Sequence, residues 1–126
     1  MNGPAVLVVE DVPQIRATAV QLFQELGCEV FDAYNGQSAL KILEAHPEIQ
    51  VLFADIRMPG MSGPELAQVA RRLRPDLRIV LTSGYVSGDD VPDGIPVVPK
   101  LWCTGDLADV VGRAPSVGEW TPGRAA

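Results

Sequence analysis

The sequence contains no hydrophobic run long enough to cross a membrane, and no basic stretch precedes its first apolar segment. Two acidic residues, Glu10 and Asp11, follow that segment at once. A secretory signal carries basic residues before its apolar part, so these features argue against one. We therefore expect a cytoplasmic protein with no membrane partner.

Cysteine and positive charge are also scarce. The two cysteines, Cys28 and Cys103, lie far apart and form no CxxC pair, which fits a reducing cytoplasm better than a disulfide scaffold. Ten Lys and Arg residues are outnumbered by sixteen Asp and Glu, giving a net charge of -6, and the arginines within residues 71–74 form the only basic cluster. Because a nucleic-acid surface needs clustered positive charge, direct binding to nucleic acid is disfavoured.

Histidine is nearly absent. The single histidine, His46, lies just before Pro47 at the expected end of a helix. A favourable interaction with the helix dipole explains this position better than a role as phosphate carrier or metal ligand. A glycine-rich loop that could cradle phosphates is also missing after the first apolar run, so flavin binding is weakly supported.

Short apolar runs alternate along the chain with helical patterns, which is typical of a parallel sheet covered by helices. The predicted strands are residues 5–9, 29–33, 51–54, 78–81 and 95–98. The predicted helices are Pro13 to about Leu26, Gln37 to Ala45, Pro64 to Leu73, and Gly105 to Arg113. Gly27 ends the first of them as a left-handed cap. In the third, the residues expected to face inward are Leu66, Val69, Ala70 and Leu73. At 126 residues the chain suits one α/β domain, a doubly wound five-stranded parallel sheet of flavodoxin-like order 2-1-3-4-5.

Two segments lack the expected helical or strand pattern. Residues 84–94, GYVSGDDVPDG, contain three glycines and one proline, so the fourth helix of such a fold would be short or absent here. Residues 115–126 are similarly rich in residues that interrupt regular structure. We therefore expect a domain over residues 1–114 and a flexible tail over residues 115–126.

Polar side chains follow four of the five predicted strands. Since the carboxyl ends of parallel strands share one edge of the sheet, these side chains should lie together. They are Glu10 and Asp11 after the first strand, Asp55 after the third, Thr82 after the fourth and Lys100 after the fifth.

This set of residues suits phosphoryl chemistry. Three neighbouring carboxylates repel one another, and Mg2+, which prefers oxygen ligands, would offset that repulsion. A carboxylate such as Asp55 can form an acyl phosphate, while Lys100 and the hydroxyl of Thr82 could neutralise and orient the phosphoryl oxygens.

The ordered motifs VLVVED, DIRMPGMSG, VLTSG and PK resemble those of receiver domains of two-component response regulators. The resemblance implies that Asp55 accepts a phosphoryl group from a histidine kinase or a histidine phosphotransfer protein. It also implies that Asp11, Asp55 and the backbone carbonyl of Arg57 bind Mg2+ directly, that Glu10 acts through water, and that Lys100 and Thr82 bind the phosphoryl oxygens.

The chain departs from the family pattern in its output region. Leu101 replaces the usual proline after the lysine, so we predict a trans bond there, because a non-proline cis bond costs about 2.5–4 kcal/mol. Val97 replaces the usual Tyr or Phe three residues before the lysine. The segment between Thr82 and Lys100 is also short for the family. Phosphorylation chemistry is therefore expected to be intact and the output machinery altered.

Three functions remain open on this evidence. The leading one is a phosphorylation-controlled receiver that binds an unknown downstream target, either as a separate protein or within a hybrid histidine kinase. A Mg2+-dependent aspartyl-phosphate phosphatase is the first alternative, although Arg57 occupies the position where phosphatases of the haloacid dehalogenase type usually carry a second acid. An inert interaction module is the second, although none of the chemical residues is missing.

Overall fold

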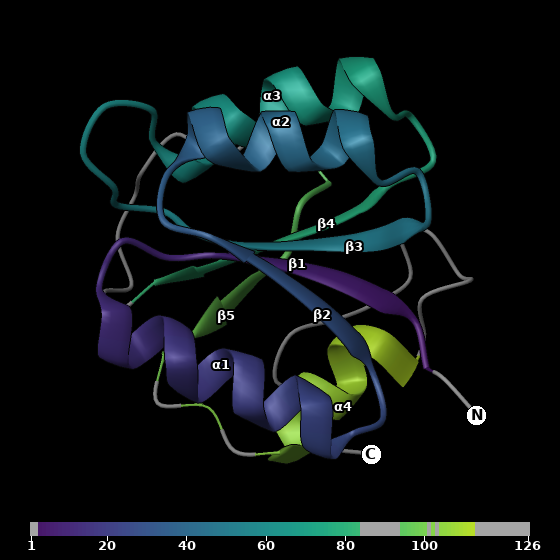
Figure 1. Ribbon diagram of the computed structural model, residues 1–126. Helices are drawn as coiled ribbons and strands as arrows, with labels where there is room; N and C mark the ends of the chain where they lie inside the picture. Colours follow the sequence, from purple (N-terminus) through teal and green to yellow (C-terminus); the bar gives the residue numbers. More distant parts are fainter. Residues whose placement is uncertain (1–2, 84–93, 101, 103, 113–126) are drawn as a thin grey trace.

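A computed structural model describes residues 3–83, 94–100, 102 and 104–112 (Figure 1). Its five strands form one parallel sheet in the order β2-β1-β3-β4-β5, which confirms the predicted fold. The strands are β1 (Ala5–Val9), β2 (Glu29–Ala33), β3 (Ile49–Asp55), β4 (Arg78–Ser83) and β5 (Val97–Pro99). The helices are α1 (Pro13–Glu25), α2 (Gly36–Ala45), α3 (Gly63–Leu73) and α4 (Thr104–Gly112).

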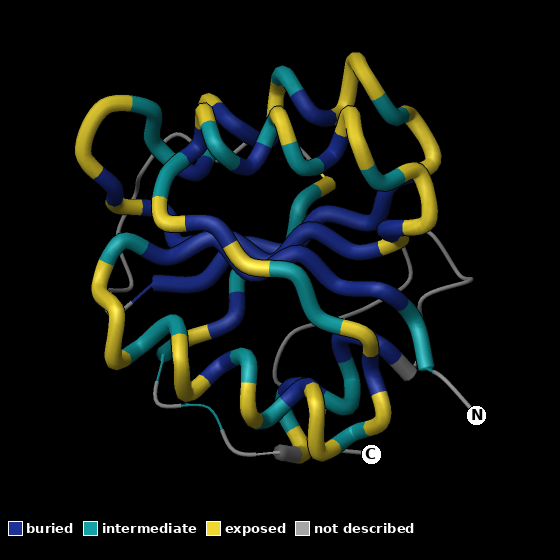
Figure 2. The backbone as a smooth tube through the Cα atoms, in the orientation of Figure 1, coloured by how far each residue is buried: buried dark blue, intermediate teal, exposed yellow. Residues whose placement is uncertain are grey.

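The helices form two layers on opposite faces of the sheet. Helices α2 and α3 cover one face, and α1 and α4 cover the other (Figure 1). Side chains alternate along β1, so that Leu7 packs with α2 and α3 while Val6 and Val8 pack with α1 and α4. The central strands are buried on both faces, as Figure 2 shows, which is why they read in the sequence as continuous apolar runs.

Several expectations concern residues beyond those described. The short or absent fourth helix falls on residues 84–94, of which only Gly94 is described, and the flexible tail falls on residues 115–126. The trans bond involves Leu101, which also lies outside the described residues. These three statements stay predictions. Among the helices described, none is long and apolar enough to cross a bilayer.

The helix ends follow local sequence signals. Pro13 occupies the first turn of α1, and Gly27, with φ of 87°, follows its end in the left-handed conformation that the sequence predicted. Helix α3 begins with a capping box, in which Ser62 and Glu65 each accept a backbone N–H from the other residue.

The inward orientation predicted for Leu73 is wrong. It is the last residue of α3 and is 48% exposed, because the inner stripe of this helix ends at Ala70.

Gly63 allows α3 to start against the end of β3. Its N–H donates to the carbonyl of Ile56 at 2.9 Å, and a Cβ placed on Gly63 would lie 2.3 Å from the carbonyl oxygen of Asp55. That oxygen belongs to the backbone and cannot turn away. Glycine is therefore required by close packing at this position.

Gly63→Ala is expected to lower the free energy of unfolding by about 1–3 kcal/mol, the usual range for overpacking a tight site. Urea unfolding would measure the loss. Gly36→Ala is the matched control, because its added methyl group would meet the flexible side chain of Met61 instead of backbone. Equal losses in the two variants would contradict the assignment of Gly63 to close backbone packing.

Candidate functional site

The predicted polar residues converge at the carboxyl edge of the sheet, and alternation along the strands brings four of them to the same face. Val8, Phe53, Val80 and Val98 pack in the core between the sheet and the layer of α1 and α4. Two residues beyond each of these, on the same side of the strand, come Glu10, Asp55, Thr82 and Lys100. The polar site therefore continues one face of the apolar core.

Three carboxylates form the centre of the site. Oxygen atoms of Glu10, Asp11 and Asp55 lie within 4.8 Å of one another. Glu10 is 2% exposed and Asp55 is 5% exposed, so water stabilises their charges poorly. Burial raises the pKa of the Glu10 carboxyl, and the charge of Asp55 adds to that increase, while hydrogen bonds from Lys100 and the Val12 N–H only partly offset it. The cluster has the oxygen donors and the excess negative charge that a hard divalent cation requires.

Lys100 neutralises part of this charge. Its Nζ atom lies 2.9 Å from Oε1 of Glu10 and 3.1 Å from Oδ2 of Asp55. Burial alone would lower the pKa of Lys100, but its hydrogen bonds to Glu10 and Asp55 outweigh that effect and leave the pKa raised. The ammonium group therefore stays charged at neutral pH and joins the ends of β1 and β3 to the end of β5.

The turn after Asp55 is tied to the neighbouring strand. The Ile56 N–H donates to the carbonyl of Thr82 at 2.9 Å, and the Ile56 carbonyl accepts the N–H of Gly63. The N–H of Arg57 approaches Oδ1 of Asp55 at 3.4 Å, a long hydrogen bond. Arg57, whose backbone carbonyl was predicted as a metal ligand, thus lies in the turn that begins at the carboxylate cluster.

Thr82 lies beside Asp55 in the register of β3 and β4, but its hydroxyl does not act on the carboxylates. The hydroxyl donates to the carbonyl of Val98 at 2.7 Å and accepts the indole N–H of Trp102 at 2.9 Å. The predicted phosphoryl-binding role of Thr82 would therefore require this hydroxyl to turn from β5 toward Asp55.

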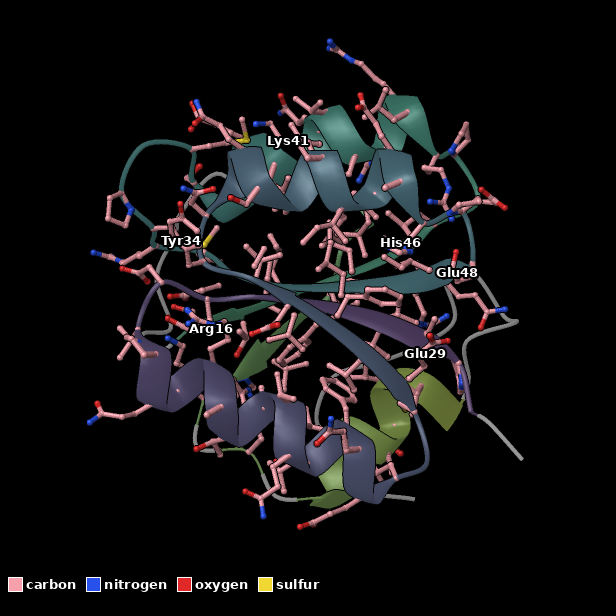
Figure 3. The ribbon with its side chains drawn as sticks, viewed as in Figure 1. Arg16, Glu29, Tyr34, Lys41, His46 and Glu48 are labelled. Carbon is pink, nitrogen blue, oxygen red and sulfur yellow. The ribbon has the colours of Figure 1, made fainter. Side chains whose placement is uncertain are left out.

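Arg16 is a residue of this site that the sequence reasoning missed. From α1 it reaches the ends of β1 and β2 (Figure 3), where Nη1 donates to the backbone carbonyl of Glu10 at 2.8 Å and Nε pairs with Asp32 at 3.1 Å. One signal could have revealed it. A helix N-terminus favours acidic residues, so an arginine just after the first turn of α1 is out of place unless it has acidic or carbonyl partners.

Comparisons with known proteins agree on one family. A family model described as the response regulator receiver domain matches residues 6–97. The response regulator receiver protein CpdR of Brucella abortus is 32% identical over 111 residues, covering 84% of this chain and 92% of CpdR. The sensor kinase CckA of the same organism is 37% identical over 87 residues. That match covers 68% of this chain but only 9% of the length of the kinase.

Solved structures are similar over most of the chain. The response regulator protein TrrA of Thermotoga maritima in complex with Mg2+-BeF is 32% identical, with a TM-score of 0.78, and the match covers 88% of this chain and 98% of TrrA. TrrA in complex with the histidine kinase ThkA gives a TM-score of 0.78 at 31% identity, covering 90% of this chain and 99% of the matched one.

Proposed function

This chain belongs to the family of response regulator receiver domains, and we propose from that premise that it accepts a phosphoryl group on Asp55 and thereby changes its output surface. The observation that carries the proposal is the position of Asp55. Its carboxylate is buried at the centre of the acidic cluster, and the ammonium group of Lys100 lies 3.1 Å away. The donor would be a phosphohistidine of a histidine kinase or a histidine phosphotransfer protein.

The transfer would proceed by displacement at phosphorus. A carboxylate oxygen of Asp55 attacks phosphorus, and the bond from phosphorus to the histidine nitrogen of the donor breaks, leaving its electron pair on that nitrogen. The ammonium group of Lys100 is close enough to Asp55 to bind an oxygen of the incoming phosphoryl group. The hydroxyl of Thr82 would bind a second oxygen after it leaves the carbonyl of Val98.

The carboxylate cluster fits a magnesium ion. We propose that Asp11, Asp55 and the backbone carbonyl of Arg57 would hold it directly and that Glu10 would act through a water molecule. Mg2+ supplies positive charge against the phosphoryl oxygens when it is bound. The solved complex of TrrA with Mg2+-BeF supports Mg2+ as the cation.

The partners are proposed by class. The crystallised complex of TrrA with the kinase ThkA supports a histidine kinase as the donor, and the downstream partner would be a protein that distinguishes the two phosphorylation states. The relatives include both a receiver of about this length and a sensor kinase, and neither match names a phosphodonor for this chain. The donor is therefore proposed by its chemistry, a phosphohistidine.

Removal of magnesium is expected to slow phosphorylation strongly. Intact mass would be measured after incubation of the chain with acetyl phosphate, once with Mg2+ and once with EDTA in excess. We expect one phosphoryl adduct with Mg2+ and, because three carboxylates would otherwise repel the phosphodonor, a rate lower by about tenfold or more without it. Equal adduct formation in both samples would contradict a magnesium-dependent site.

Two further assays on the same protein separate the alternative functions. Sustained hydrolysis of small phosphate monoesters over many turnovers would indicate a Mg2+-dependent aspartyl-phosphate phosphatase. Absence of an adduct with both acetyl phosphate and a panel of phosphorylated histidine kinases would indicate an inert interaction module.

A further inference from the structure

Trp102 is held beside the site by aromatic packing. It lies two residues after Lys100, is half-buried, and packs against the core under α1 and α4. Its ring contacts Phe53 edge to face, with centroids 5.4 Å apart, and Phe53 contacts Phe23 in the same way at 5.3 Å. These contacts fix the direction in which the indole N–H points.

The indole N–H points at the hydroxyl of Thr82. The two atoms lie 2.9 Å apart, and Thr82 is 2% exposed, so water does not compete well for either group. A threonine hydroxyl has one proton, and here that proton is donated to the carbonyl of Val98. The hydroxyl therefore cannot donate to a phosphoryl oxygen while it keeps this arrangement.

Position 97 cannot supply this contact. Val97 packs with the core on the opposite face of the sheet, under α2 and α3, whereas Thr82 and Trp102 lie on the face covered by α1 and α4. Among the residues described, the aromatic side chain bonded to the Thr82 hydroxyl is thus Trp102, which follows β5.

We propose that Trp102 is a positioning residue for phosphoryl transfer, whose indole N–H holds the Thr82 hydroxyl turned toward β5 until Asp55 is phosphorylated. The phosphoryl group then competes for the hydroxyl, and its capture releases the indole N–H. This inference rests on the proposed function, because the competition arises only if Asp55 accepts a phosphoryl group. The release would link the state of the site to Trp102, two residues after Lys100.

The fluorescence of Trp102 tests the release directly. The 126-residue chain contains two tryptophans, so it would carry Trp120→Phe, leaving Trp102 as its sole indole. Addition of Mg2+ and beryllofluoride, a phosphoryl mimic, is expected to shift the emission of Trp102. Thr82→Val should abolish the shift, whereas Thr82→Ser, which keeps a hydroxyl, should preserve it.

A double-mutant cycle separates positioning from general packing. Trp102→Phe keeps a ring beside Phe53 but removes the N–H, so it should tighten beryllofluoride binding about two- to tenfold, the worth of one hydrogen bond. In the Thr82→Val background the same change should have no effect, because the hydroxyl is already gone. A merely structural role would instead give the same change in both backgrounds.

The outcomes distinguish this inference from the proposed function. Intact mass with acetyl phosphate would be recorded on the same variants. A phosphoryl adduct with no emission shift, or with additive effects in the cycle, would overturn the role of Trp102 alone. No adduct with acetyl phosphate or phosphorylated kinases, and no beryllofluoride binding, would overturn the proposed function and this inference with it.

Discussion

Asp55→Asn is expected to abolish the phosphoryl adduct completely. The amide has the shape of the carboxylate but lacks the nucleophilic oxygen that must attack phosphorus. Its carbonyl can still accept the N–H of Arg57, and the loss of one negative charge from the acidic cluster reduces repulsion. The fold should therefore survive, and intact mass with Mg2+ and acetyl phosphate would record the loss of the adduct.

Asp76→Asn is the matched control for this variant. Asp76 is exposed and comes shortly before β4 begins, so it lies at the edge of the sheet opposite the site. This variant should be phosphorylated at the wild-type rate. An adduct that persisted in Asp55→Asn, located by peptide mapping on Glu10 or Asp11, would show that another member of the cluster is the acceptor.

Lys100→Met is expected to lower the free energy of unfolding by about 3 kcal/mol at neutral pH. Methionine preserves much of the apolar stem, but it leaves the buried carboxylates of Glu10 and Asp55 without their cation. Removal of one partner of a buried ion pair costs about 3–5 kcal/mol, and the side chain of Lys100 is 16% exposed, so the lower end of that range applies. Phosphorylation should also slow by at least about tenfold, because the phosphoryl oxygens lose a positive charge.

The loss in free energy of unfolding caused by Lys100→Met should depend on pH. The pKa of Glu10 is raised in the folded protein by burial, and loss of the hydrogen bond from Lys100 raises it further. A group with a raised pKa contributes stability at low pH and loses it as the pH rises through the folded pKa. The deficit should therefore be largest at neutral pH and shrink as the pH falls through the raised pKa of Glu10, where protonation removes the unpaired charge.

Urea unfolding at mildly acidic and at neutral pH would measure this dependence. Lys41→Met is the control, because Lys41 is exposed on α2 in the opposite helical layer (Figure 3). We expect it to unfold like the wild-type protein at both pH values. A loss in Lys100→Met that did not change with pH would show that Lys100 stabilises the fold by packing and not by neutralising carboxylates.

Residue periodicity made most of the architecture predictable. Alternation of apolar runs with helical patterns led to the five-stranded order, and only the ends of elements differed, as in β3, which extends from Ile49 to Asp55. The convergence of Glu10, Asp55 and Lys100 was predictable because parallel strands share one edge for their carboxyl ends. These features follow from local spacing and a general rule of topology.

Contacts between distant side chains were not predictable in the same way. Arg16 on the backbone of Glu10 and Trp102 on the hydroxyl of Thr82 depend on which way each side chain turns. The orientation of Leu73 was predicted wrongly for a related reason, since periodicity states which residues share a face but not where the covering element ends.

The sequence by itself therefore determined the fold and the kinds of side chain that meet at the edge of the sheet, because local spacing predicts the strands and parallel strands bring their carboxyl ends to one edge. Only the tertiary structure decided how the charges are distributed and which partner holds the Thr82 hydroxyl. The hydroxyl has one proton and can donate to only one acceptor at a time. Its partners, Val98 and Trp102, lie 16 and 20 residues away in sequence, so the packing of β4, β5 and Trp102 determines these contacts.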